Sequence, residues 1–568
     1  MNNNYKSNDS GERTPNGLLS VINNEDGNQE NNDREGNNLE EVARMDEDVR
    51  SVEETSNNRD SHSSSEDEID WGTNPINPDW LEEGSECSSS AGEGNYDGSR
   101  PAGPKSPNVI WIPKPKHKWF VVKEIAKREI GDFRHPASFT QRFYGSLHAV
   151  QRLELMYKLE KHEGCVNAIN FNSSGTRLIS GSDDKLIAVW NWTVGKCLTT
   201  FNSGHSSNVF QCKYLPLTGD GHIVTCSRDG QVRLALQTSN GGYESSQTLA
   251  HHSRACHKIS IIKQEPHVVL SAGADAQVFC IDVREKKPNR LMYVKEDSSR
   301  ISLYSINVNP LEPNEFCISG EDLYIRLYDR RFISRNGVPK VKYSPAHLQQ
   351  EKSVYVTCAV FSYNGAEVIG SYNDDDIYMF DTKQPSGTNY VHRYEGHRNS
   401  ETVKGVNFFG PKSEFVVSGS DCGNIYIWDK NTEAIVQWMR GDEDGVINCL
   451  EPHPKIPVLA TSGLDSDIKI WVPSCENEPS LAGLAKTVKI NRKKRYCRAI
   501  GSRDSLNDTL VRWWRQMRYI QRHQNLREGA PIFIEIGTIG RSFARPNEDD
   551  DSSISSSSSS SSSSSCSD

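Results

Sequence analysis

The chain has 568 residues and a formal net charge of −11 at pH 7, and the negative charge is concentrated at its two ends. Residues 1–100 hold 25 acidic and 7 basic side chains, and 547–568 hold five acidic and no basic ones, which leaves 101–546 with a net charge of +12. No apolar run approaches the ~18 residues that cross a bilayer. The first residues, MNNNYKSNDS, lack the charged-then-apolar pattern of a signal peptide. We therefore expect neither membrane insertion nor secretion.

Both ends are predicted to be disordered. Residues 1–105 and 547–568 are rich in polar and acidic residues and have too few apolar side chains to offset the entropy of ordering the chain. Three serines in the first segment directly precede a run of acids: Ser63, Ser64 and Ser65. Such serines are candidate phosphorylation sites for acidophilic kinases, and phosphate would add to the negative charge. A purely solvating tail is the alternative.

Residues 106–152 are predicted to form a helical extension, because apolar residues recur every three or four positions in 120–130 and again in 137–155. Fourteen cysteines are scattered along the chain without any C-x-x-C pair. This pattern is typical of reduced thiols, and not of a zinc site or a disulfide framework. We therefore expect no metal site and no cofactor.

From 153 to 475 the sequence repeats with a period of about 47 residues. Each repeat has a Ser/Thr-Gly-Ser-x-Asp type of turn and then an alternating apolar run. The runs close at Trp190, Ala235, Ile281, Tyr328, Phe380, Trp428 and Trp471. The acidic residues of the turns are Asp184, Asp229, Asp275, Asp322, Asp374, Asp421 (one position early) and Asp465. Histidines that precede several of these turns by about 22 to 25 residues are His162, His205, His252 and His397.

This repeat resembles the WD-repeat family, and the resemblance implies an all-β fold, a seven-bladed propeller. The physics favours the same fold, because a four-stranded unit cannot bury both of its faces alone, whereas units stacked around a channel can. We expect each turn aspartate to accept hydrogen bonds from its own turn and from the histidine. The alternating residues 153–159 are predicted to be the outer strand of the last blade, which closes the ring.

No catalytic motif accompanies the repeat. The sequence has no G-x-S-x-G elbow, no H-E-x-x-H helix and no Walker lysine loop. The histidines and aspartates that would suggest a catalytic triad all fall at repeat positions, where a structural hydrogen bond explains them. We therefore expect a non-enzymatic protein without a small-molecule substrate, and a propeller that acts as a docking platform for proteins.

Two adjacent repeats have an Asp one residue after the closing position and an Arg three residues after it. These D-x-R boxes are Asp282 with Arg284, and Asp329 with Arg331. They resemble the W-D-x-R box of substrate receptors for cullin-4 ubiquitin ligases, in which the arginines reach from the narrow face of the propeller into the damaged-DNA-binding-protein adaptor. The alternative is that Arg after the closing pair is common in WD repeats of every role.

Longer stretches resemble the eighth cullin-4-associated factor of that family, notably TVKGVNF at 402–408, GPKSEFVVSGSDCG at 410–423 and NCLEPHP at 448–454. The resemblance covers roughly 160–475. It implies a receptor that docks on the adaptor and cullin-4 and presents a protein substrate for ubiquitination, with the wide face of the propeller free to hold that substrate. The scattered reduced thiols separately favour a location in the nucleus and the cytoplasm.

Residues 476–546 contain two basic features. The first is a candidate nuclear import signal made of Arg492, Lys493, Lys494 and Arg495. The second is a predicted amphipathic helix over 505–523, for which packing or docking is favoured over membrane binding because a lone short helix anchors weakly. These features support an alternative function, a ligase-independent WD-repeat scaffold that binds histones or nucleic acid through its basic body and C-terminal segment.

Overall fold

The computed structural model describes residues 112–131, 137–333, 337–350, 353–443 and 445–499. The chain divides into two units, 1–98 and 99–568, and all described residues belong to the second unit. Several predictions lie outside the described residues: the disorder of 1–105 and 547–568, the phosphosites Ser63, Ser64 and Ser65, and the amphipathic helix over 505–523.

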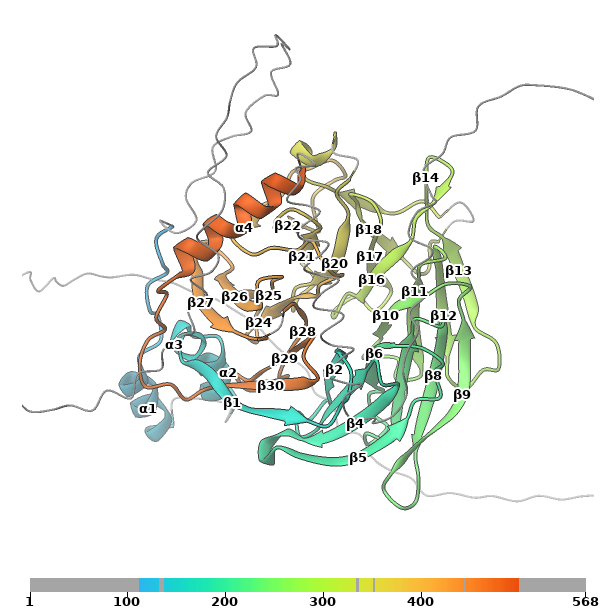
Figure 1. Cartoon of the computed structure of the whole chain (residues 1–568), viewed down its shortest axis with the longest axis horizontal. Helices are drawn as coiled ribbons and strands as arrows, with labels where there is room; N and C mark the ends of the chain where they lie inside the picture. Colours follow the sequence, from blue (N-terminus) through green and yellow to red (C-terminus); the bar gives the residue numbers. More distant parts are fainter. Residues whose placement is uncertain (1–111, 132–136, 334–336, 351–352, 444, 500–568) are drawn as a thin grey trace, which may run out of the picture. The chain divides into compact units, whose positions relative to one another are not determined.

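The second unit is a propeller of seven four-stranded antiparallel sheets arranged around a central channel (Figure 1). The predicted all-β, seven-bladed fold is thereby confirmed. In blades 1 to 6 the strands follow the chain from the innermost to the outermost, as β2-β3-β4-β5, β6-β7-β8-β9, β10-β11-β12-β13, β16-β17-β18-β19, β20-β21-β22-β23 and β24-β25-β26-β27. Blade 7 has the order β28-β29-β30-β1.

The strands are short, as the repeat requires. Those of blades 1 to 3 are β2 (Val166–Phe171), β3 (Leu178–Ser182), β4 (Leu186–Asn191), β5 (Lys196–Asn202), β6 (Val209–Tyr214), β7 (His222–Ser227), β8 (Gln231–Gln237), β9 (Tyr243–His251), β10 (Cys256–Ile261), β11 (Val268–Gly273), β12 (Gln277–Asp282) and β13 (Asn289–Tyr293). Those of blades 4 and 5 are β16 (Leu303–Val308), β17 (Glu315–Gly320), β18 (Ile325–Asp329), β19 (Val341–Tyr343), β20 (Val356–Phe361), β21 (Glu367–Tyr372), β22 (Ile377–Asp381) and β23 (His392–Tyr394). Those of blades 6 and 7 are β24 (Val406–Phe409), β25 (Phe415–Gly419), β26 (Asn424–Asp429), β27 (Ile435–Arg440), β28 (Ile447–Pro452), β29 (Leu459–Gly463), β30 (Asp467–Pro473) and β1 (Leu153–Glu160). A two-stranded hairpin, β14 (Lys295–Glu296) and β15 (Ser299–Arg300), connects blades 3 and 4.

Strand β1 closes the ring, as the sequence predicted. It pairs antiparallel with β30 from Leu153 opposite Pro473 to Glu160 opposite Asp467. The first strand of the repeat region is therefore hydrogen-bonded to the last one, although more than 300 residues separate them along the chain.

The core consists of seven apolar clusters, one at each contact between neighbouring blades. The cluster between blades 6 and 7 also includes Tyr144, Leu147 and Val150 from the helices that precede β1. Each blade thus buries one face against the blade before it and one against the blade after it, so that no blade has a complete core of its own.

Among the residues that the structure describes, four helices accompany the propeller: α1 (Val121–Glu129), α2 (Ala137–Tyr144), α3 (Leu147–Gln151) and α4 (Leu484–Ala499), with single 3-10 turns at Trp192–Val194 and Ala346–Leu348. The prediction of one helix over 137–155 was wrong. The chain breaks at Gly145, the Ser146 side chain accepts a hydrogen bond from Ala149 N at 3.2 Å to begin α3, and β1 already starts at Leu153. Within the described ranges, no helix is long and apolar enough to cross a membrane.

A pair of leucines on β1 tests the closing strand. Leu159 is 1% exposed and packs between blades 7 and 1, whereas Leu155 on the same strand is 40% exposed. Leu159→Ala should lower the free energy of unfolding by about 2–5 kcal/mol, and Leu155→Ala by no more than about 0.5 kcal/mol. Urea denaturation of both variants measures the difference, and equal effects would contradict the closure of the ring by β1.

Candidate functional site

Blades 1 to 3 contain the predicted histidine–aspartate pairs. In blade 1, His162 Nδ1 lies 2.8 Å from Asp184 Oδ2 and His162 Nε2 lies 2.7 Å from Ser180 Oγ, which also accepts a hydrogen bond from Trp190 Nε1 at 2.8 Å. The corresponding pairs in blades 2 and 3 are His205 with Asp229 at 3.2 Å and His252 with Asp275 at 3.0 Å. In all three blades the pair joins the loop before the innermost strand to the turn after the second strand.

The blade 1 arrangement has the composition of a Ser-His-Asp triad, but it does not present a nucleophile. Ser180 is completely buried and its hydroxyl oxygen already accepts from Trp190. An external substrate therefore has no access to it, and the residues act as a structural hydrogen-bond network.

The contribution of such a pair to the stability of the fold depends on pH, as Asp275 illustrates. Burial alone would raise the pKa of Asp275, but its hydrogen bond to His252 and the charge of that ring lower the pKa to about 2. Since an unfolded aspartate titrates near about 3.9, this carboxylate stabilises the fold above about pH 4. That contribution is lost as the pH falls towards about 2.

Blades 4 and 5 use an arginine in place of the histidine, and this arginine is fully buried in blade 4 and only partly buried in blade 5. The Arg326 guanidinium, 1% exposed, is paired with Asp322 of its own turn and with Glu296 of the β14–β15 hairpin. In blade 5 the predicted Asp374 does not hold this position. Its neighbour Asp376 accepts from Arg393 Nη2 at 2.6 Å and from Arg495 Nη1 at 2.8 Å.

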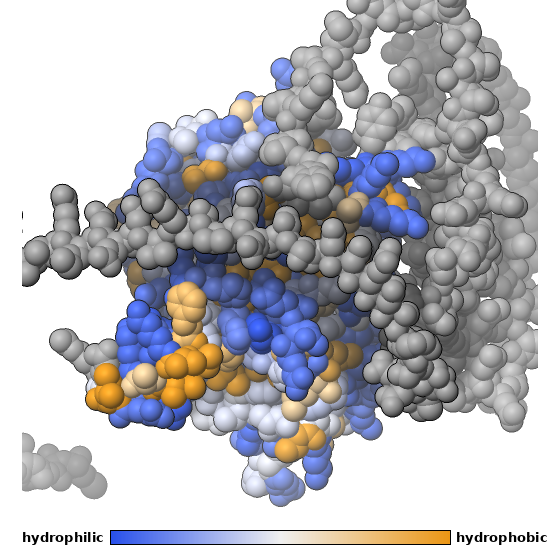
Figure 2. Space-filling view, turned by 90° about the vertical axis from the view of Figure 1, so that its left-hand side faces the viewer, coloured by the Kyte–Doolittle hydropathy of each residue, from blue (hydrophilic) through white to orange (hydrophobic). Residues whose placement is uncertain are grey.

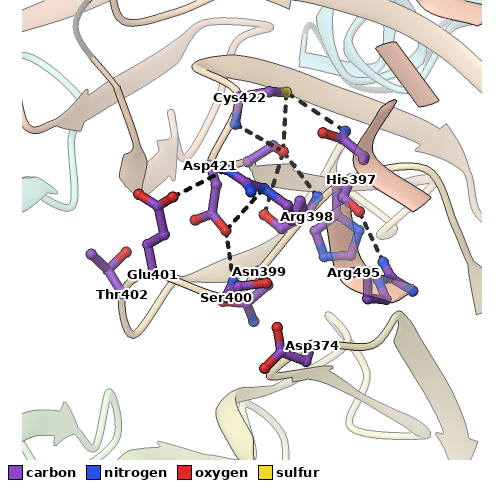
Figure 3. Close-up of polar contacts among 12 residues, drawn as sticks. Asp374, His397, Arg398, Asn399, Ser400, Glu401, Thr402, Asp421, Cys422 and Arg495 are labelled. Atoms are coloured by element: carbon purple, nitrogen blue, oxygen red, sulfur yellow. Dashed lines mark hydrogen bonds and ion pairs between the residues drawn. The ribbon is translucent and has the colours of Figure 1, made fainter. Parts of the chain in front are cut away.

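In blade 6 the predicted pairing of His397 with Asp421 is wrong (Figure 3). Asp421 forms an ion pair with the buried Lys404 and accepts from Ser400 N at 2.7 Å. Neither ring nitrogen of His397 has a hydrogen-bond partner within the described part of the chain. Burial, together with the nearby Arg495, lowers the His397 pKa to about 3, so the ring is neutral and packs edge-on against Trp428. Because Asp421 stands one position earlier than the other turn aspartates, it pairs with Lys404 and not with His397.

Blade 7 replaces the histidine with an acid and adds a lysine. Asp442 precedes Asp465 by 23 residues, and its Oδ2 accepts from Asp465 N. Lys469 Nζ, 2% exposed, lies between three carboxylates, at 3.0 Å from Asp442 and 2.9 Å from Asp465, and also in contact with Asp467. These three acids lie close enough together to hold a metal ion. The ammonium group already supplies the positive charge, so the cluster does not favour a cation.

The sequence reasoning missed the buried cations Arg326, Lys404 and Lys469. One signal was present for blade 7, since Asp442 stands at the spacing of the missing histidine. For the other two blades no spacing rule identifies the partner, because an arginine or lysine reaches the turn from the middle of a strand or from the preceding loop.

The two D-x-R boxes have the same geometry in neighbouring blades. Arg284 donates from Nε and Nη2 to Asp282 at 2.9 and 2.6 Å, and Arg331 donates from Nε and Nη2 to Asp329 at 3.0 and 2.7 Å. In each box the backbone N–H of the arginine also donates to the aspartate at 3.0 Å. The side chains of Arg284 and Arg331 are 65% and 55% exposed. The aspartate therefore fixes the arginine in one orientation while leaving it accessible.

The surroundings of the second box link the two blades and offer apolar contacts. Arg330 of blade 4 donates to Glu265 of blade 3 and to Asn314, so the two boxes are held at a fixed distance from each other. A pocket of about 420 Å³ lies beside the second box, and its lining includes Asp329, Phe332 and Val338. Phe332 and Val338 are strongly exposed.

Both boxes lie on the face opposite the histidine–aspartate pairs. Successive strands are antiparallel, so the turns after the first and third strands share one face, and the turn after the second strand lies on the other. Helix α2 packs on the box face, since Tyr144 Oη donates to the carbonyl of His453, in the turn after β28, at 2.9 Å. Glu124 of α1 pairs with Arg142 of α2 at 2.6 Å and attaches α1 to this assembly.

Helix α1 exposes an apolar surface. Its exposed apolar residues, with those at its two ends, are Phe120, Val121, Val122, Ile125 and Ile130. Figure 2, which looks onto the left-hand side of Figure 1, shows a group of apolar side chains low on this side, and α1 lies low on the same side in Figure 1. A helix with this much exposed apolar area is typical of a protein contact surface.

Helix α4 covers blades 5 and 6 and contains the basic run predicted as an import signal. Asn491 donates to the Gly396 carbonyl at 2.9 Å, Arg492 pairs with Glu395 at 2.6 Å, and Arg495 pairs with Asp376. The two arginines of the run are therefore bound to the propeller, whereas Lys493 and Lys494 are exposed.

The repeats match a known family. The family described as WD domain, G-beta repeat matches residues 153–191, 195–234, 388–429 and 434–472, which contain most of blades 1, 2, 6 and 7. Blades 1, 2, 6 and 7 therefore consist largely of WD repeats. The remaining three blades have the same four-stranded topology, although blades 4 and 5 lack the histidine.

Three curated relatives extend the comparison. DDB1- and CUL4-associated factor 6 of Homo sapiens is 28% identical over 342 residues, which is 56% of this chain and 40% of that protein. Protein ALTERED SEED GERMINATION 2 of Arabidopsis thaliana is 32% identical over 288 residues, 44% of this chain and 38% of that protein. WD and tetratricopeptide repeats protein 1 of Homo sapiens is 27% identical over 615 residues, 63% of this chain and 90% of that protein. This chain thus spans about two fifths of the length of the first two.

The contrast between two histidines tests the revised hydrogen-bond network. His162→Phe should lower the free energy of unfolding by about 1–3 kcal/mol, because it removes the hydrogen bonds of the buried ring to Asp184 and Ser180. His397→Phe should have an effect of less than about 1 kcal/mol, because its ring nitrogens make no hydrogen bond in the described structure. Thermal and urea unfolding of both variants measure the difference. A larger loss in His397→Phe would contradict the assignment.

The lysine of blade 7 provides a second test. Lys469→Met leaves buried carboxylates without their cation and should cost about 3–5 kcal/mol. Lys158→Met is the matched control, since Lys158 contacts the same Asp467 at 3.6 Å but is part of an ion pair with the exposed Glu443, and it should cost at most about 1 kcal/mol. Equal losses in the two variants would show that Lys469 does not act as the central cation.

Proposed function

We propose that this chain is a non-catalytic substrate receptor of a cullin-4 ubiquitin ligase, and that it docks on the damaged-DNA-binding-protein adaptor through its two D-x-R boxes. The observation that supports this most directly is the identical, aspartate-fixed and exposed orientation of Arg284 and Arg331 in adjacent blades. A planar guanidinium held in this way loses little entropy on binding and can hydrogen-bond to carboxylates or carbonyls of a partner.

The geometry of the box face supports a large interface. Two arginines alone would bury little area, whereas a stable complex needs on the order of 800 Å² from each partner. The pocket beside Phe332 and the apolar surface of α1 add contact area. The pocket lies beside the second box at blade 4, and α1 is attached to α2, which packs on the box face at blade 7.

The comparisons support the same class of function. A relative with 28% identity over 342 residues is named DDB1- and CUL4-associated factor 6. The finer likeness to the eighth member of that series, the presentation of a bound protein for ubiquitination, and a location in nucleus and cytoplasm are part of the proposal. The alternative scaffold that binds histones or nucleic acid has less support, because Arg492 and Arg495 of the basic run are paired with acids of the propeller.

The test is co-purification of the adaptor and cullin-4 with the full chain. Arg284→Ala with Arg331→Ala should weaken adaptor binding by roughly a thousandfold if the two effects add, because anchoring arginines are interface hot spots. The Arg→Lys pair should also bind weakly, since an ammonium group cannot reproduce the bidentate fork. Val122→Glu on α1 should give a smaller loss.

The matched control replaces Arg290 and Arg300, two exposed arginines outside the boxes, by Ala. This control and every box variant should keep the circular dichroism and melting temperature of the wild type, because the boxes lie outside the buried hydrogen-bond network. Recovery of adaptor at wild-type levels by a folded box variant would refute the docking role and favour the scaffold.

A further inference from the structure

Six of the seven innermost strands have a β-bulge at the same position. In each, one residue is left out of the ladder with the second strand: Asn167, Phe210, His257, Tyr304, Thr357 and Asn448. A bulge re-aims the side chain of its extra residue. These strands are the innermost of their sheets and surround the axis of the ring; Thr357 is fully buried, whereas the other five bulge residues are partly exposed.

The bulges mark the channel mouth on the face opposite the D-x-R boxes. The carbonyl two residues before each bulge residue accepts a hydrogen bond from the first residue of the turn after the second strand, for example Cys165 O from Asp183 N at 3.1 Å and Asn208 O from Arg228 N at 3.0 Å. These are the turns that also hold the histidine–aspartate pairs. The bulge residues therefore lie at that end of the channel.

Four aromatic rings form a continuous arc around one side of this mouth. The aromatic arc consists of the bulge residues Phe210, His257 and Tyr304 of blades 2 to 4 and of Tyr355, which directly precedes β20 of blade 5. The ring centroids of successive members are 5.2, 5.3 and 5.6 Å apart, and the first two rings are parallel within 7°. All four side chains are partly exposed. Blades 7 and 1 have Asn448 and Asn167 at the bulge instead, so the two sides of the mouth differ in polarity.

The His257 ring belongs to the arc as a neutral aromatic. Burial, with Lys258 and Arg254 nearby, lowers the pKa of His257 to about 4. The ring is therefore uncharged at neutral pH and stacks on Phe210 without bringing positive charge into the arc.

Positive charge is found at the rim of the arc in blades 2 and 3. Arg228 is the first turn residue of blade 2 and is exposed. Blade 3 has Ala274 at this position, and the exposed Arg254 donates to the Ala274 carbonyl at 3.5 Å, which places a guanidinium there. Blade 4 has the exposed Glu321, while Asp183 of blade 1 accepts from Asn167 Nδ2 at 2.6 Å.

We propose that the aromatic arc binds an acidic peptide, which inserts one aromatic side chain into the channel mouth and directs its carboxylates to Arg228 and Arg254. Offset and edge-on contacts with several rings favour an aromatic guest, and the two arginines repel a cationic one. A single-stranded nucleic acid would also stack on such rings. The mouth is enclosed by blades instead of forming a groove that follows a phosphate backbone, which favours a short side chain over a nucleic-acid strand.

This binding goes beyond the ligase role and does not require it. The arc and the boxes lie on opposite faces, so a bound peptide leaves the proposed adaptor surface free. Loss of one interaction is therefore measurable while the other is intact.

The experiment is a fluorescence polarisation titration of the full chain with a short fluorescein-labelled peptide that has one tryptophan between pairs of glutamates. Saturable binding is expected, and the same peptide with alanine for tryptophan should bind about tenfold more weakly or worse. Tyr304→Ala should weaken binding of the probe to a similar extent. Tyr363→Ala, which removes an exposed ring in the turn after β20 on the other face, is the matched control and should bind like the wild type.

A charge-reversal variant provides a second test, and it changes no buried residue. Arg254→Glu changes an exposed side chain, and it should weaken binding of the glutamate peptide while improving the relative affinity for a version with lysines. The proposal is overturned if the wild type shows no saturable binding, if the lysine version binds as tightly as the glutamate version, or if oligothymidylate binds more tightly than either. It is also overturned if folded Tyr304→Ala and Arg254→Glu both bind the probe like the Tyr363→Ala control.

Discussion

The closure of the ring is the constraint on which the rest of this structure depends. Every blade has two apolar faces, and a four-stranded sheet of this size cannot bury both without neighbours on each side. The pairing of β1 with β30 supplies the last neighbour, so that all seven blade contacts contain a buried cluster. The positions of the boxes, the channel mouth and the helices all follow from this closed ring.

Each blade of the closed ring must supply a partner for the carboxylate of its turn, and the seven blades do so in two ways. The turn after the second strand places a carboxylate beside the loop that enters each blade. Blades 1 to 3 satisfy it with a histidine, as in His162 with Asp184, whereas blades 4 to 7 use an arginine or lysine, which is buried in blades 4, 6 and 7 and partly buried in blade 5. A buried cation and its acids must be matched, because removal of either leaves an uncompensated charge. Arg495 of α4 is a further example, because its ion pair with Asp376 attaches α4 to blade 5.

The antiparallel course of the strands separates two potential binding surfaces. The turns after the third strand hold Arg284 and Arg331 in fixed, exposed orientations on one face, together with the pocket at Phe332. On the other face, three bulges of the innermost strands carry the aromatic residues Phe210, His257 and Tyr304, whose rings contact one another in sequence. A protein that binds an adaptor on one face and a target on the other can bring the two together without either interaction blocking the other.

The sequence by itself determined the all-β propeller, the number of blades, the closing strand and the position of the two D-x-R boxes, because these depend on periodicity and on residues that are local in the chain. It did not determine the partners of the turn acids in blades 4 to 7, the break at Gly145 or the attachment of α4. Arg326, Lys404 and Lys469 have long side chains whose partners depend on how neighbouring loops pack, and Arg495 meets Asp376 from 119 residues away. The aromatic arc is likewise a product of tertiary structure: its four rings are spaced about one repeat apart, and only the stacking of blades 2 to 5 brings them into contact.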